Sequence, residues 1–178
     1  MPRTPESTQQ DTEEPDRRNP WEAYAPDADR PPLASYATIA GGFSCGLATF
    51  LVIRRQQAGG LPERVALQDI GVVAGASFAL SRLLTKKKVT AFLRAPFTEY
   101  EGKGDAPGEL EERPRGSGPK RAIGELLTCP YCLDMWAATA GIIGLVLVPR
   151  ETRVVTSILA AFGLSDLFQG VYRKSIGG

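Results

Sequence analysis

The 178-residue sequence contains no histidine, the side chain that most often acts as a general base or binds a metal ion near neutral pH. It has only three cysteines, and one of these is isolated, so the disulfide framework of a small secreted domain is excluded. A strong net charge is also missing. The 21 Lys and Arg residues nearly balance the 20 Asp and Glu residues, and the net charge of +1 favours no particular class of partner.

The N-terminal segment lacks the apolar core of a signal peptide. Residues 1–32 are rich in Pro, Arg, Gln and acidic residues, and eight acids precede Pro31. Such a composition cannot bury enough apolar surface to offset the entropy lost on ordering. We therefore predict that residues 1–32 form a disordered polar tail.

Apolar segments dominate the rest of the chain. A helix of roughly 20 apolar residues crosses the hydrocarbon core of a bilayer, so we expect four transmembrane helices, at about residues 33–53, 65–84, 127–148 and 154–172. The second segment carries Asp69 and Arg82 near its two ends, where both can reach the membrane interfaces. The predicted fold class is all-α, a small integral membrane bundle in residues 33–178. A soluble helical domain is the alternative, because the second segment is charged at both ends.

The basic residues predict the orientation. With Arg82 counted in the 85–126 connector, the tail, the connector and the C-terminal end carry sixteen Lys and Arg residues, and the two short turns carry five. Basic residues accumulate in cytoplasmic loops, so we expect both termini and the connector to lie on the cytoplasmic side of the membrane. The Gly- and Pro-rich part from Pro96 to Pro119 predicts a loop without a core. Six acids lie among the basic residues between Arg82 and Arg121, which argues against nucleic-acid binding.

Several chemically active side chains should gather at the cytoplasmic ends of the spans. Helix rise places Asp134 roughly 7 Å beyond Cys129, and Asp166 roughly 9 Å before the end of the last span. The predicted layer contains Arg82, Glu125, Asp134, Trp136 and Asp166, together with Cys129 and Cys132. Because an ionisable group within a span needs a partner, we expect Arg82 to pair with Asp134 or Asp166. This pair either has a chemical function or only fixes the helix register.

The segment Cys129-Pro130-Tyr131-Cys132 has three interpretations. It resembles the active-site tetrapeptide of glutaredoxins, although the βαβ context of such a motif is missing. It could supply half of a zinc or iron site, which a homodimer would complete with four thiolates. In the third interpretation Thr128 caps a helix, Pro130 lies in its first turn, and the two thiols pack as small apolar groups without a disulfide. Cys45, deep in the first segment, is expected to be buried by helix packing.

The stretch from Glu125 to Cys132 (Glu-Leu-Leu-Thr-Cys-Pro-Tyr-Cys), followed by Trp136, resembles the signature of a family of small bacterial membrane proteins catalogued as domain of unknown function 1360. The preceding stretch from Arg94 to Thr98 (Arg-Ala-Pro-Phe-Thr) fits the same pattern. The resemblance covers about residues 70–172, and the family includes a sporulation-associated protein of bacilli. It implies a membrane location and supplies no known activity.

We therefore expect a structural or interaction role within the lipid bilayer, with an unidentified protein partner and without enzymatic activity or a cofactor. The alternative is a dithiol protein, or a zinc or iron protein, that uses Cys129 and Cys132 and assembles as a homodimer.

Overall fold

The computed structural model describes residues 31–57 and 60–176, so nearly all of the predicted disordered tail lies outside the described residues. The described elements are α1 (Leu33–Gln56), α2 (Leu67–Thr85), the 3-10 helix η1 (Lys88–Thr90), α3 (Ala91–Arg94), β1 (Thr98–Lys103), β2 (Leu110–Pro114), α4 (Gly118–Thr128), α5 (Pro130–Leu147) and α6 (Pro149–Ile176).

Four helices, α1, α2, α5 and α6, are long and apolar enough to cross a membrane. The predicted all-α class is confirmed, and each of these helices overlaps one of the four predicted segments. The main difference in bounds is that α6 begins at Pro149, where the sequence suggested a turn. Proline suits the first position of a helix because that position needs no backbone N–H donor, so Val148 alone separates α5 from α6.

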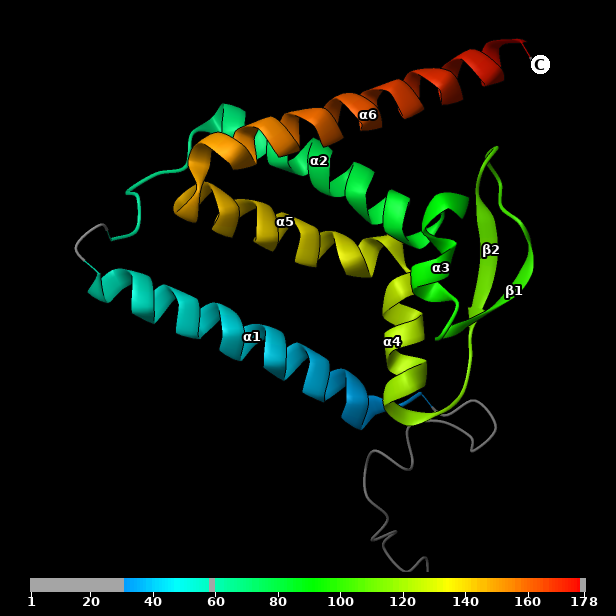
Figure 1. Cartoon of the computed structure of the whole chain (residues 1–178), viewed down its shortest axis with the longest axis horizontal. Helices are drawn as coiled ribbons and strands as arrows, with labels where there is room; N and C mark the ends of the chain where they lie inside the picture. The colour runs from blue at the N-terminus through cyan, green and yellow to red at the C-terminus, as the bar shows by residue number, and fades with distance from the viewer. Residues whose placement is uncertain (1–30, 58–59, 177–178) are drawn as a thin grey trace, which may run out of the picture.

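Helix α2 lies between α5 and α6 and packs against both (Figure 1). Glycines allow the close approach. A Cβ atom added to Gly75 would lie 3.4 Å from Ala160 Cβ, and one added to Gly163 would lie 3.0 Å from Ala79 Cβ. At Gly141 of α5 it would come within 2.8 Å of a Val73 methyl group. Small residues therefore set the spacing of the three helices, as is common where helices pack within lipid.

Apolar side chains are distributed the opposite way from those of a soluble protein. Among the described residues, the buried apolar set is limited to Val73, Ala76, Ala79 and Ala122. Large apolar side chains are instead exposed along the long helices, for example Ile53, Ile158 and Phe168 at 50%, 64% and 66%. Exposed apolar surface on this scale marks contact with a membrane or a partner.

Helix α1 stands apart from the other three long helices and packs mainly against α4 (Figure 1). A Cβ atom added to Gly42 or Gly46 would meet nothing within 4 Å, and Cys45 is exposed. The prediction that Cys45 is buried by helix packing is therefore wrong for this chain alone, because no described helix covers that face of α1.

The connector is folded, which corrects the prediction of a loop without a core. Strands β1 and β2 form an antiparallel hairpin with a bulge between Tyr100 and Gly102. The hairpin is hydrogen-bonded to the chain that follows α2, through Lys88 N to Gly108 O (2.8 Å) and Leu110 N to Lys86 O (2.9 Å). We call residues 86–128 the polar cap. It lies where α2 and α6 end and where α1 and α5 begin (Figure 1).

At the opposite end of the molecule, Arg153 of α6 binds Asp69 of α2. Its Nε lies 3.0 Å from Asp69 Oδ1, and one terminal nitrogen lies 2.8 Å from Oδ2. Such two-point pairing with a carboxylate is geometrically specific. The acid near the start of the second apolar segment is therefore satisfied by a partner that the sequence alone did not suggest.

Candidate functional site

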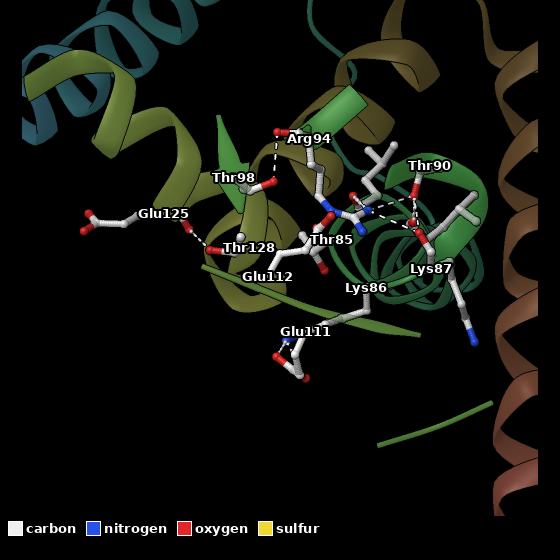
Figure 2. Close-up of polar contacts among 12 residues, drawn as sticks. Thr85, Lys86, Lys87, Thr90, Arg94, Thr98, Glu111, Glu112, Glu125 and Thr128 are labelled. Atoms are coloured by element: carbon white, nitrogen blue, oxygen red, sulfur yellow. Dashed lines mark hydrogen bonds and ion pairs between the residues drawn. The ribbon is translucent and has the colours of Figure 1, made fainter. Parts of the chain in front are cut away.

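The polar cap is built around Arg94, whose side chain is fully buried (Figure 2). Its guanidinium binds the carboxylate of Glu112 on β2 and donates to Leu84 O (2.7 Å) in the last turn of α2 and to Lys87 O (3.3 Å) just before η1. A further bond reaches Thr90 Oγ1 at 3.0 Å. The last carbonyls of a helix lack intrahelical donors and carry partial negative charge, so a buried cation satisfies them. Arg94 thus joins α2 to the hairpin.

Around this centre, further ion pairs fasten the cap to α2 and α6. Arg82 lies 2.6 Å from the buried carboxylate of Glu109, and Lys87 lies 3.5 Å from the same carboxylate. Lys87 also bonds Asp166 of α6 at 3.0 Å. The predicted pairing of Arg82 with Asp134 or Asp166 is therefore wrong, because the hairpin supplies Glu109 to Arg82 and the lysine run supplies a cation to Asp166.

Helix α4 is fixed against the hairpin by a close backbone approach at Gly124. A Cβ atom there would lie 2.6 Å from Phe97 O and 3.1 Å from Pro114 Cβ. The same Phe97 carbonyl accepts a bond from Arg115 N, and Thr98 Oγ1 donates to Arg94 O. The stretch from Arg94 to Thr98 therefore links the hairpin to α4, and so helps to position the cysteine pair that follows α4.

The cysteine pair opens α5 directly after α4. Cys129 is the N-cap residue, and its sulfur accepts a bond from Cys132 N at 3.2 Å. Thr128, predicted as the cap, instead donates to Glu125 O within α4. The two sulfurs lie at disulfide distance, where the structural interpretation expected separate thiols. One helical turn brings positions i and i+3 onto the same face, so the spacing itself allows this approach.

A cavity of about 670 Å³ adjoins the two sulfurs, between α1, α4 and α5. Its walls are mainly apolar and include Tyr36 and Phe43 of α1 and Met135 and Trp136 of α5. The rings of Phe43 and Trp136 meet edge to face, with centroids 4.7 Å apart. Trp136 is therefore a contact between α1 and α5.

Glu125 is the acidic residue on this cavity wall. Its carboxylate accepts a bond from Arg121 Nε at 2.9 Å, within α4, and another from the Tyr36 hydroxyl of α1. Burial beside apolar walls raises the pKa of Glu125 above its ordinary value. The Tyr36 bond joins α1 to the polar cap.

The structure divides the predicted layer into separate groups. Arg82 and Asp166 lie on the α6 side, where both line a second cavity near the end of α6. Glu125, Cys129, Cys132 and Trp136 line the cavity on the α1 side. Asp134 has one buried carboxylate oxygen without a hydrogen-bond partner and pairs with none of the predicted groups.

Within residues 31–57 and 60–176, no three His, Cys, Asp or Glu side chains converge as a set of metal ligands. Cys129 and Cys132 alone supply two thiolates, and a structural zinc site needs four ligands.

The sequence pattern did not single out several residues of the observed sites, among them Tyr36, Arg94, Glu109 and Glu112. The acids stand among many other charges in a segment that looked like a loop, so nothing marked them as buried. For Arg94 a signal existed, because it begins the stretch on which the family resemblance rests.

The comparisons with known proteins agree with this resemblance. A family described as a protein of unknown function (DUF1360) matches residues 72–172, more than half of the chain. The chain belongs to this family. The match begins inside α2 and ends in α6, so DUF1360 includes the polar cap and the cysteine pair, and α1 lies outside it.

Two relatives come from Bacillus subtilis (strain 168). Sporulation protein YjcA is 33% identical over 101 residues, which are 56% of this chain and 86% of that protein. The UPF0713 protein YngL is 30% identical over 107 residues, which are 60% of this chain and 80% of that protein. No solved structure matches the chain. The DUF1360 membership thus links the chain to a sporulation-related family, without a known reaction.

Proposed function

We propose that this chain is a multi-pass protein of the bacterial cytoplasmic membrane with a structural or interaction role. The observation that carries the proposal is the distribution of side chains. Four long helices expose large apolar residues, and the charged residues of the connector gather in one cap at their ends. A bilayer would cover the helices and leave the cap in water.

The orientation follows from the charge. Sixteen of the 21 basic residues lie on the side of the cap and the two termini, counting Arg82 with the cap. The positive-inside rule then places the cap and both termini in the cytoplasm. Asp69 and Arg153 would lie at the outer interface, where their ion pair lets α2 and α6 keep charged groups near lipid.

The contact surface of this role is the junction between the cap and α5. Tyr131, between the two cysteines, is 90% exposed, and Tyr100 on the hairpin is 65% exposed. Tyrosine is enriched at protein interfaces because it buries a large area at a low cost in side-chain entropy. We assign this surface to a protein partner in the cytoplasm.

Site-specific photo-cross-linking tests the interaction role. A photoreactive residue at Tyr131 should give a discrete protein adduct in cells. The matched control is the same residue at Val154, which is 60% exposed at the other end of the molecule and should give none. Equal adducts from both positions, or none from Tyr131, would contradict the proposal.

A second candidate is a dithiol function, favoured by one observation, the disulfide distance between Cys129 and Cys132. The metal version of this candidate needs two chains, each supplying two thiolates to one zinc or iron ion. Elemental analysis together with a free-thiol count separates the versions. About half a metal ion per chain with protected thiols supports the homodimer site. A cysteine pair that holds no metal and passes reversibly between dithiol and disulfide supports the dithiol version. Two thiols that bind no metal and form no disulfide eliminate both versions.

A further inference from the structure

The cavity between α1, α4 and α5 has the size and lining of a small-molecule site. Its volume of about 670 Å³ lies within the usual range of about 300–1,000 Å³ for such sites. The walls are mostly apolar, with three aromatic side chains, Tyr36, Phe43 and Trp136. The few polar groups are gathered at Glu125 and the cysteine pair, so a bound molecule would have an apolar body and a compact polar head.

The charge of the lining restricts that head. Glu125 is the charged side chain among the lining residues, and its partner Arg121 does not line the cavity. A phosphate headgroup would therefore meet a carboxylate without a facing cation, which is unfavourable. The carbonyl oxygens of a neutral head can instead accept hydrogen bonds from the thiols, and hydroxyl groups on such a head can donate to the Tyr36 oxygen and the Glu125 carboxylate.

The cysteine pair adds redox chemistry to the same wall. Both sulfurs border the cavity and lie at disulfide distance, so the pair can pass between dithiol and disulfide without a large movement. Forming the disulfide releases two electrons and two protons, and an acceptor must take them up. Among lipid-soluble neutral molecules with carbonyl heads, quinones accept both.

We propose that this cavity binds a lipid-soluble quinone and that Cys129 and Cys132 reduce it. The proposal rests on the dithiol candidate above and names its electron acceptor. Two S–H bonds break and one S–S bond forms. The two electrons and two protons pass to the carbonyl oxygens of the quinone, which becomes a hydroquinone. Helix α1, which lies outside the family match, supplies the third wall of the site.

Binding is measured with the full-length protein in detergent, carrying Trp21→Phe so that Trp136 is the single tryptophan. Decylubiquinone should quench the Trp136 fluorescence saturably. Ala40→Phe fills the cavity from α1 and should weaken binding at least about tenfold, or about 1.4 kcal/mol. Ala48→Phe is the matched control, because Ala48 is exposed on the same helix and does not line the cavity.

Electron transfer is measured without oxygen on the reduced protein, with Cys45→Ser so that the pair holds the only thiols. Decylubiquinone should convert both thiols to a disulfide and yield one hydroquinone per chain. Ala40→Phe should slow this reaction about tenfold and leave oxidation by glutathione disulfide unchanged. The second oxidant reports on the dithiol itself and does not need the cavity.

Each contrary outcome has a distinct meaning. Quenching that does not saturate, that Ala40→Phe leaves unchanged, or that phosphatidylglycerol displaces would overturn the quinone site. Thiols that glutathione disulfide oxidises and decylubiquinone does not would overturn the electron transfer and leave the dithiol candidate standing. Thiols that react with neither oxidant would overturn both.

Discussion

At the scale of single residues, the buried Arg94 does most to hold the polar cap on α2. Its guanidinium joins Glu112 of β2 to Leu84 O in the last turn of α2, and both charged side chains are nearly inaccessible, at 0% and 7% exposure. A buried ion pair is weak evidence for net stabilisation, but removing one partner leaves an uncompensated buried charge. The cap should therefore be sensitive to the loss of either partner.

Replacing Arg94 by alanine tests this role. Arg94→Ala removes the donor to Glu112 and to Leu84 O and should lower the free energy of unfolding by about 3 kcal/mol. Thermal unfolding in detergent, followed by circular dichroism, measures the loss. The control is Arg113→Ala, because Arg113 is 62% exposed and pairs with exposed Glu99. That change should cost at most about 0.5 kcal/mol, and equal losses would refute the assignment.

Glu125 gives the cap a pH dependence. Its pKa is raised from the ordinary value of 4.5 because burial disfavours the charged form. The folded state then holds the proton more tightly than the unfolded state, so this group's contribution to stability is present at low pH. It is lost as the pH rises from 4.5 through the raised pKa.

The measurement compares the wild type with Glu125→Gln, which keeps the side-chain shape and cannot ionise. The melting temperature of the wild type should fall relative to that of the variant as the pH rises through this window. A wild type that gains stability relative to Glu125→Gln would show that the Arg121 and Tyr36 bonds outweigh the burial of the charge.

The residue scale also shows where sequence reasoning ends. The sequence predicted that Glu125, Cys129, Cys132 and Trp136 lie close together, because all four fall within twelve consecutive residues around the start of a helix. In the structure all four line one cavity. It could not choose the partners of Arg82 and Asp166. Several charges of opposite sign lie in the connector, and only the folded hairpin decides that Glu109 meets Arg82 and Lys87 meets Asp166.

At the scale of elements, the hairpin and α4 form one unit because Gly124 admits the backbone of Phe97. Gly124→Ala should lower the free energy of unfolding by about 2 kcal/mol, since a methyl group there overlaps Phe97 O and Pro114. Gly71→Ala is the control, because open space surrounds Gly71 within its helix. Alanine favours a helix over glycine, so this change should be neutral or stabilising. An equal loss of stability in both variants would contradict the close packing of Gly124 against Phe97.

The sequence did not predict the hairpin because its first strand lacks the apolar pattern of a strand. Strand β1, Thr-Glu-Tyr-Glu-Gly-Lys, has few apolar residues and thus no apolar face, and hydrophobic periodicity is the main signal for a strand. The hairpin as a whole is held instead by ion pairs and by hydrogen bonds to the chain after α2. The four long helices carry long apolar segments with few charges, which is why their existence was predicted and only their ends were displaced.

At the scale of the whole molecule, one axis organises the chain. The cap, the start of α1 and the end of α6 lie at one end, and the starts of α2 and α6 lie at the other (Figure 1). The Asp69–Arg153 pair joins these two helix starts. In the proposed arrangement, a bilayer surrounds the helices between these ends and the cap lies in the cytoplasm.

Labelling of single cysteines in intact cells tests this claim most directly. In a chain whose three native cysteines are replaced by serine, Glu63→Cys and Asp105→Cys provide exposed positions at opposite ends. A membrane-impermeant maleimide should label Glu63→Cys in intact cells and Asp105→Cys only after the membrane is permeabilised. Labelling of Asp105→Cys from outside, or of both positions alike in intact cells, would contradict the account.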